Sequence, residues 1–183
     1  EQIEAVGGHL NAYTSREQTA YFAKVLKEDL PLAINILADI LQNPIFDEEE
    51  LRREQTVVIQ EIGQTQDTPD DIVFDYFQDV AFPDQPLGRP ILGSSENVSS
   101  FTRETLSTYM AKHYTPSHMV VSAAGNINHD RFVELTNQTF LSATTENTGT
   151  FETARYVGGS VYQKRDLEQV HLLLGFNGLA YED

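Results

Sequence analysis

Two glutamates in the stretch DEEELRREQTVVIQEIG, residues 47–63, carry the clearest chemical implication of this sequence. At about 100° per residue, Glu54 and Glu61 fall on one helical stripe together with four apolar residues, Leu51, Val57, Val58 and Ile62. An ionised carboxylate on an apolar face is costly unless it meets a cation, a metal ion or several donors. The pattern leaves two interpretations open: a site that binds a metal or another cation, or carboxylates at the edge of the stripe that reach water or an arginine.

The helix that presents these glutamates has signals at both ends. Asp47 is expected to be its N-cap, and the three glutamates that follow lie in the first turn, where the helix dipole favours negative charge. Gly63 is expected to end the helix.

Composition limits the classes of function. The 183 residues are enough for one domain, or for one domain and part of another. The chain has 28 acidic and 12 basic residues, and this negative charge disfavours nucleic acid and anionic membranes as partners, because both are polyanions. No cysteine is present, which excludes disulfides and thiolate metal sites. No apolar tract is long enough to span a membrane, and we expect the chain to be cut at both ends.

The other predicted elements alternate between helices and strands. Residues 1–6 predict a helix that ends at Gly7, and 9–15 with 19–26 predict a β-hairpin. Further along the chain we expect helices at 29–43, 70–81, 98–114 and 129–140, an ordered loop at 82–97, and strands at 119–124, 159–163 and 170–176. This order indicates an α+β fold, a layered domain with several helices packed on a mostly antiparallel β-sheet.

Four ordered blocks carry a family resemblance: GGHLNAYTSREQTAYFAKVL, LRREQTVVIQEIG, LGRPILGSSENV and YTPSHMVVSAAGNI. Together they resemble the pitrilysin/insulinase family of zinc peptidases, and within it the branch that is similar to mitochondrial processing peptidases. The resemblance implies a division into a truncated first repeat domain at 1–145, a linker at 146–156 within a Thr-, Ser- and Asn-rich stretch, and the first strands of a second repeat domain at 157–183.

The resemblance also implies roles for the two glutamates. The family has an inverted zinc motif, His-x-x-Glu-His, and a third metal ligand from a glutamate on a later helix. By position, Glu61 would be that ligand, and Glu54 would be the acidic neighbour that supports the catalytic site. This implication favours the metal interpretation of the stripe.

One departure from the family is important. The His-x-x-Glu-His motif is absent, and the five histidines contain no His-x-x-x-His pair. A lone carboxylate does not hold zinc near neutral pH, so we expect zinc to be the cofactor of the intact protein and not to be retained by this chain. As a 183-residue fragment, the chain is predicted to be inactive.

The hairpin carries a second implication. In the resembling family the strand with the pattern GGxxNAxT binds a peptide substrate as an added β-strand, so Asn11, Ala12 and Tyr13 would be the contact residues. The alternative from the residues alone is an ordinary internal strand with Tyr13 in the core.

Two functions therefore follow from the sequence. The first is part of a zinc metalloendopeptidase that cleaves peptides or presequences. The second is a non-catalytic subunit, related to processing peptidases, that binds peptides or supports a complex. The expected partners are a peptide, a second homologous half or partner subunit, and a second copy of the chain that exchanges its terminal strands. A bacterial cytoplasmic or periplasmic location is favoured, and the mitochondrial matrix is the alternative.

Overall fold

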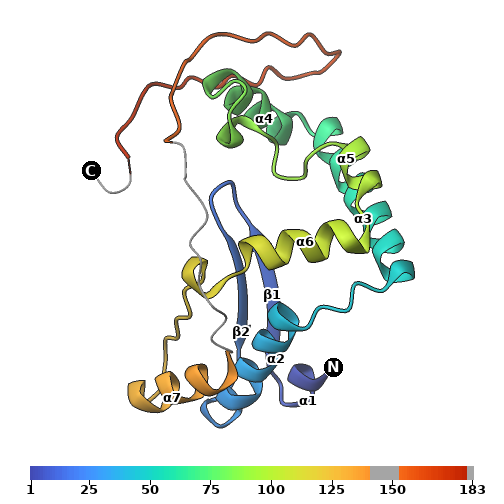
Figure 1. Ribbon diagram of the computed structural model, residues 1–183. Helices are drawn as coiled ribbons and strands as arrows, with labels where there is room; N and C mark the ends of the chain where they lie inside the picture. The colour runs from blue at the N-terminus through green and yellow to red at the C-terminus, as the bar shows by residue number, and fades with distance from the viewer. Residues whose placement is uncertain (141–152, 181–183) are drawn as a thin grey trace. The chain divides into compact units, whose positions relative to one another are not determined.

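The computed structural model describes residues 1–140 and 153–180, and its architecture confirms the expected α+β class. In these residues a two-stranded antiparallel sheet is accompanied by seven α-helices and three short 3-10 helices (Figure 1). The chain divides into two compact units. The described residues of the first unit are 1–51 and 102–140, and those of the second are 52–101 and 153–180.

The first unit is built on the predicted hairpin. Strands β1 (His9–Thr14) and β2 (Thr19–Lys24) pair antiparallel, with His9 opposite Lys24 and Thr14 opposite Thr19. The turn is closed by two bonds: Ser15 N–H donates to the Gln18 carbonyl at 2.8 Å, and Gln18 N–H donates to Ser15 Oγ at 3.2 Å. A serine side chain that bonds nearby backbone in this way stabilises a turn locally, which explains why the hairpin was readable from sequence.

Helices pack around the hairpin. Helix α1 (Gln2–Ala5) has Val6 as its C-cap and is followed by Gly7, whose φ of 72° is readily adopted by glycine. Helix α2 (Leu30–Gln42) contacts both β2 and α7 (His129–Thr139), and α6 (Arg103–His113) is capped by Thr102. The small core of this unit consists of apolar side chains from these helices: Ile3, Ala33, Ile34, Ala38 and Phe132.

The second unit contains three helices that follow one another along the chain. They are the main part of α3 (Glu48–Asp67), α4 (Pro69–Ala81) and α5 (Ser95–Ser100). Asp47 caps α3 as predicted, since its Oδ1 accepts the N–H of Glu49 at 2.9 Å. The prediction that Gly63 ends α3 is wrong. A helix tolerates one internal glycine at a cost of about 1 kcal/mol, and this helix continues to Asp67, just before Thr68 and Pro69.

The predicted helix at 98–114 is divided in two. Ser94 caps α5 by accepting from Asn97 N–H at 3.2 Å, and Thr102 caps α6 by accepting from Thr105 N–H at 3.2 Å. Each cap starts a new helix, so the predicted single helix is wrong in its boundary, and Phe101 lies between the two.

Three predicted strands are not strands in the described residues. Residues 119–124 run without a ladder, and Val120 is 93% exposed, so the predicted buried strand is wrong. Residues 159–163 and 170–176 are likewise extended without ladder pairing. Apolar alternation alone cannot make a strand, because a strand needs a partner for its backbone groups. The division at 145 and 157 stays a prediction, and most of the predicted linker lies outside the described residues.

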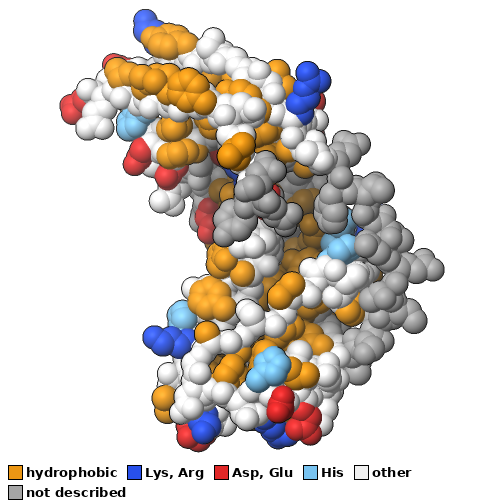
Figure 2. Space-filling model, turned by 90° about the vertical axis from the view of Figure 1, so that its left-hand side faces the viewer, with side chains coloured by type: hydrophobic (Ala, Val, Ile, Leu, Met, Phe, Trp, Pro, Cys, Tyr) orange, Lys and Arg blue, Asp and Glu red, His pale blue; other side chains and the backbone are white. Residues whose placement is uncertain are grey.

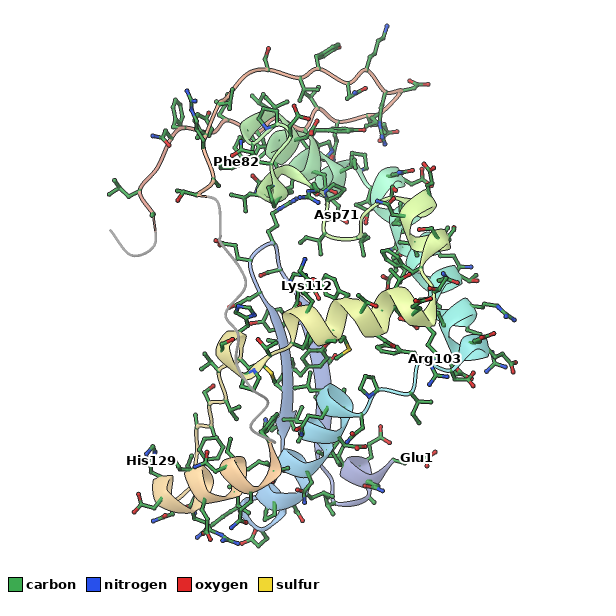
Figure 3. All side chains as sticks on the ribbon, in the orientation of Figure 1. Glu1, Asp71, Phe82, Arg103, Lys112 and His129 are labelled. Atoms are coloured by element: carbon green, nitrogen blue, oxygen red, sulfur yellow. The ribbon has the colours of Figure 1, made fainter. Side chains whose placement is uncertain are left out.

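The extended segment 153–180 lies on α4 (Figure 1). Val157 N–H donates to the Ala81 carbonyl at 2.9 Å, and the ring of Tyr156 packs edge-on against Phe82, labelled in Figure 3, at 6.1 Å between centroids. Figure 2 shows apolar side chains gathered on the surface of this part of the molecule. None of the described helices has the length and apolar content needed to cross a membrane.

Candidate functional site

The first candidate element is the outer edge of β1. Within the described residues β1 pairs with β2 alone, so one of its two edges has no partner strand. The bond that closes the turn fixes the alternation of the ladder, because hydrogen-bonded and non-hydrogen-bonded pairs alternate in antiparallel sheets. Asn11 and Tyr13 consequently direct their backbone groups toward β2. The backbone groups that point to the open edge belong to Leu10, Ala12 and Thr14.

One of the open donors has a local acceptor. The side-chain oxygen of Asn11 accepts the N–H of Ala12 at 2.8 Å. Unpaired edge groups invite the pairing of another chain, and a side-chain acceptor at the middle of the strand covers one of them. A strand added at this edge would displace the Asn11 carboxamide from Ala12 N–H and take its place.

The face of the hairpin next to this edge is aromatic. Tyr13 is 50% exposed and Phe22 is 42% exposed, and their ring centroids are 6.3 Å apart. Gln18 Nε2 donates to the Tyr13 hydroxyl at 3.2 Å. Tyr13 therefore lies at the surface, and the alternative that places it in the core is wrong.

The opposite face of the hairpin is anchored to α6. The hydroxyl oxygens of Tyr21, in β2, and Tyr114, which ends α6, are 3.2 Å apart. Burial raises the pKa of Tyr21, and the hydrogen bond with Tyr114 raises it further. Nothing in the sequence pointed to this pair, because the two tyrosines are 93 residues apart in the chain.

The second candidate element is the outer face of α3, which presents Glu54, Val57 and Glu61. These residues are spaced three and four apart, so they share one side of the helix. All three are exposed, Val57 to 45%. The two carboxylates lie on one side of the helix and are exposed, which agrees with the interpretation that places them at the edge of the stripe where they reach water.

The buried side of α3 is rotated from the predicted stripe. Ile62 is buried, and the polar residue on this side is Gln55 rather than Glu54. Gln55 Nε2 donates to the carbonyls of Val98 at 2.8 Å and Phe101 at 2.9 Å, which are groups at the end of α5. A neutral amide satisfies these carbonyls without the cost of burying a charge.

The residues present do not make a zinc site by themselves. No group of three or more His, Cys, Asp or Glu side chains in residues 1–140 and 153–180 could hold a metal ion. Glu54 and Glu61 are two turns apart, about 10.5 Å along the axis, whereas zinc binds oxygen at about 2.0–2.2 Å. One of the two carboxylates could be a ligand, with the other beside it, and the remaining ligands would have to come from elsewhere.

The five predicted site residues form two sets. Asn11, Ala12 and Tyr13 belong to the first unit, and Glu54 and Glu61 belong to the second. Within each set the residues lie on one strand or on one helix face. The chemistry of each set is therefore considered within its own unit.

Comparison with known proteins gives two matches to family models. The sequence matches the family model described as insulinase, peptidase family M16, over residues 1–95. It matches the model described as peptidase M16 inactive domain over residues 100–183.

Individual relatives support the same grouping. An uncharacterized zinc protease of Rickettsia felis is 45% identical over 181 residues, which cover 99% of this chain and 44% of that protein. Mitochondrial-processing peptidase subunit beta of Saccharomyces cerevisiae is 43% identical over 139 residues, which cover 76% of this chain and 30% of that protein. A protease from Helicobacter pylori of known structure shares the fold, with a TM-score of 0.74 at 24% identity over 83% of this chain and 37% of that chain. The chain thus spans less than half the length of these relatives.

Proposed function

This chain belongs to the insulinase family of peptidases, family M16, and from that membership we propose that it forms part of a zinc-dependent endopeptidase whose peptide substrate binds as a strand added to β1. The observation that supports peptide binding best is the open edge of β1, with the backbone groups of Leu10, Ala12 and Thr14 directed outward. Main-chain hydrogen bonds to such an edge give affinity for peptides of many sequences.

The three contact residues have different roles in this proposal. Ala12 offers its backbone groups at the middle of the edge. Asn11, which covers Ala12 N–H at 2.8 Å, would release it and offer its carboxamide to the peptide. Tyr13 presents an exposed ring toward the side chain of the peptide residue opposite it.

The proposed metal role belongs to Glu61, with Glu54 as its acidic support. A metal-bound carboxylate and its acidic neighbour need to be accessible on one side of a helix, and both residues lie on the exposed face of α3. When bound, zinc supplies Lewis-acid chemistry and an activated water to this family of sites. The residues of this chain would contribute one ligand, and we propose that the chain alone neither retains zinc nor cleaves peptides.

Peptide binding is tested with a short fluorescein-labelled peptide of alternating Thr and Val residues flanked by lysines. We expect fluorescence anisotropy to rise on titration with the 183-residue chain. The matched control peptide carries proline at alternate positions, which removes the N–H groups needed for pairing. Equal binding of both peptides, or binding of neither, would contradict strand addition.

The metal role is tested in the full-length protein that contains this chain. Glu61→Gln should abolish zinc retention and activity, and Glu54→Gln should weaken them by roughly ten- to a hundredfold, the usual scale for residues that support a ligand. Asp67→Asn, on the exposed end of the same helix, is the control and should change neither. Zinc content by mass spectrometry and peptide hydrolysis are the measurements. Full retention in Glu61→Gln would remove this glutamate from the ligand set. Tight, stoichiometric zinc binding by the 183-residue chain in calorimetry would contradict the proposal that the chain alone does not retain zinc.

A non-catalytic role is the second proposal. The observation that favours it is the match of residues 100–183 to a model described as an inactive domain. In that case the hairpin edge would still bind peptides, and both glutamate variants would behave like the Asp67→Asn control.

We also propose a partner for the extended segment. Val170, Leu172, Leu174 and Phe176 are 94, 77, 75 and 86% exposed, which is unusual for a row of apolar side chains. A second homologous half, a partner subunit, or the hairpin edge of a second copy could cover them. Deleting residues 157–183 should then lower the melting temperature and, for an exchanged dimer, halve the mass measured by light scattering. An unchanged melting temperature and mass would exclude strand exchange.

A bacterial cytoplasmic or periplasmic location, or alternatively the mitochondrial matrix, stays the prediction from the sequence.

A further inference from the structure

The hydroxyl pair between Tyr21 and Tyr114 joins the hairpin to the end of a helix. Tyr114 is the residue at which α6 ends, and α6 is the helix on which Arg103 and Lys112 are labelled in Figure 3. The two hydroxyl oxygens are 3.2 Å apart, and the rings meet edge-on with centroids 6.3 Å apart. Both side chains are half-buried. The contact is therefore directional as well as apolar.

One member of the pair lies opposite the residue at the middle of the candidate peptide-binding edge. Tyr21, in β2, is the ladder partner of Ala12, whose backbone groups point to the open side of β1. Residues in a non-hydrogen-bonded pair of this kind have Cα atoms only about 4.5 Å apart. A change in the position of Tyr21 is consequently passed to Ala12 across one strand.

The chemistry of the pair suits a permanent bond. Either hydroxyl can donate while the other accepts. Burial of Tyr21, with the hydrogen bond to Tyr114, raises the pKa of Tyr21, so it stays a neutral hydroxyl throughout the physiological pH range. A two-stranded hairpin has little stability of its own and needs such contacts to keep a fixed position.

We infer that the hydroxyl pair of Tyr21 and Tyr114 is a positioning device that holds the centre of the open β1 edge, at Ala12, in the geometry that an incoming peptide strand requires. This inference rests on the proposed function of the edge. In this inference, two tyrosines that are not contact residues affect peptide affinity through the pairing of β1 with β2.

The test uses Tyr21→Phe, Tyr114→Phe and the double variant in the 183-residue chain, because phenylalanine keeps the ring and removes only the hydroxyl. With the Thr/Val probe peptide, each single variant should raise Kd roughly two- to tenfold, the range that corresponds to one ordinary hydrogen bond. The double variant should be no weaker than the singles, since all three lose the same bond.

Tyr109→Phe is the matched control. Its ring lies 6.4 Å from that of Tyr114, and its hydroxyl makes no hydrogen bond within the described part of the chain. This variant should bind the probe like the unmodified chain. An equal loss of affinity in Tyr109→Phe would overturn the inference, because it would assign the effect to general packing around α6.

A purely structural role is separated by a second measurement. Amide hydrogen exchange of Asn11 and Tyr13, whose N–H groups pair with β2, should become faster in Tyr21→Phe and Tyr114→Phe and not in Tyr109→Phe. A lower melting temperature with unchanged Kd, measured where every variant is folded, would overturn positioning and leave stability alone.

Failure of the proposed function looks different. If the unmodified chain does not bind the probe, peptide binding at β1 is wrong and the positioning of the edge is judged by hydrogen exchange. Faster exchange of Asn11 and Tyr13 in the two hydroxyl variants alone would support the positioning role, and unchanged exchange would overturn it.

Discussion

The hairpin at 9–24 and the extended segment at 153–180 both contain runs that the sequence predicts as strands, and their structures differ. The predicted strands are 9–15 and 19–26 in the first region, and 159–163 and 170–176 in the second. The hairpin forms a ladder of six residue pairs. The extended segment has no ladder within the described residues, and lies on α4 through a few side-chain contacts and one backbone bond.

The difference shows where the stability of an extended chain comes from. The hairpin partner is only a four-residue turn away, so closing the loop costs little entropy, and Ser15 fixes the turn. The extended segment has no such neighbour, so side chains substitute for a ladder. The side chain of Gln85 makes two hydrogen bonds with the backbone of Arg155. Gln85 Nε2 donates to the Arg155 carbonyl at 2.9 Å, and Arg155 N–H donates to Gln85 Oε1 at 2.7 Å.

The largest expected effect comes from Gly175, where the extended segment packs against Phe77 of α4. A Cβ at Gly175 would stand 2.2 Å from the ring of Phe77, so Gly175→Ala should overpack this contact and cost about 1–3 kcal/mol. Trypsin cleavage at Lys164 and Arg165 should become faster as the segment is released. Gly178→Ala is the control, because nothing lies within 4 Å of its Cβ position. If both variants are cleaved at the same rate, the segment does not depend on its contact with α4.

The next effect concerns Gln85, whose side-chain amide bonds the backbone at the start of the extended segment. Gln85→Ala removes both bonds to Arg155 and should release the first part of the segment at a cost of about 1–2 kcal/mol, because two modest exposed bonds are lost. Hydrogen exchange of Arg155 and Val157 is the measurement. Gln163→Ala, an exposed amide of the same segment, should leave both exchange rates as they were.

The matching change in the hairpin should be smaller. Ser15→Ala removes the Oγ that accepts Gln18 N–H and donates to its carbonyl, but the bond from Ser15 N–H remains. We expect a loss of about 0.5–1.5 kcal/mol in chemical unfolding monitored by circular dichroism. Glu17→Ala changes a neighbouring side chain in the same turn and is the reference. A loss larger than that of Gln85→Ala would reverse the comparison between the two regions.

The smallest effect is a pH dependence of the hairpin. The folded state raises the pKa of Tyr21 above its ordinary value, so the unfolded chain ionises first. Stability is therefore unaffected below about pH 10 and falls above it, by less than about 1 kcal/mol at pH 10.5, since the half-exposed ring is partly screened. Unfolding at pH 8, 9.5 and 10.5 should show a smaller decrease in Tyr21→Phe than in the unmodified chain. The same decrease in both would mean that other groups cause it.

The sequence by itself determined the elements whose signals are local. The hairpin turn, the Asp47 cap, the helices at 30–42, 69–81 and 129–139, and the shared face of Glu54 and Glu61 all depend on residues a few positions apart. The family followed from four such blocks in order.

Tertiary structure decided everything that depends on distant partners. It placed Gln55 rather than Glu54 on the buried side of α3, because the carbonyls of Val98 and Phe101 accept from an amide there. It left 159–163 and 170–176 without a ladder, and it brought Tyr21 to Tyr114 across 93 residues. The physical reason is the same in each case. Burial and backbone pairing each need two segments that meet, and a local pattern describes only one of the two.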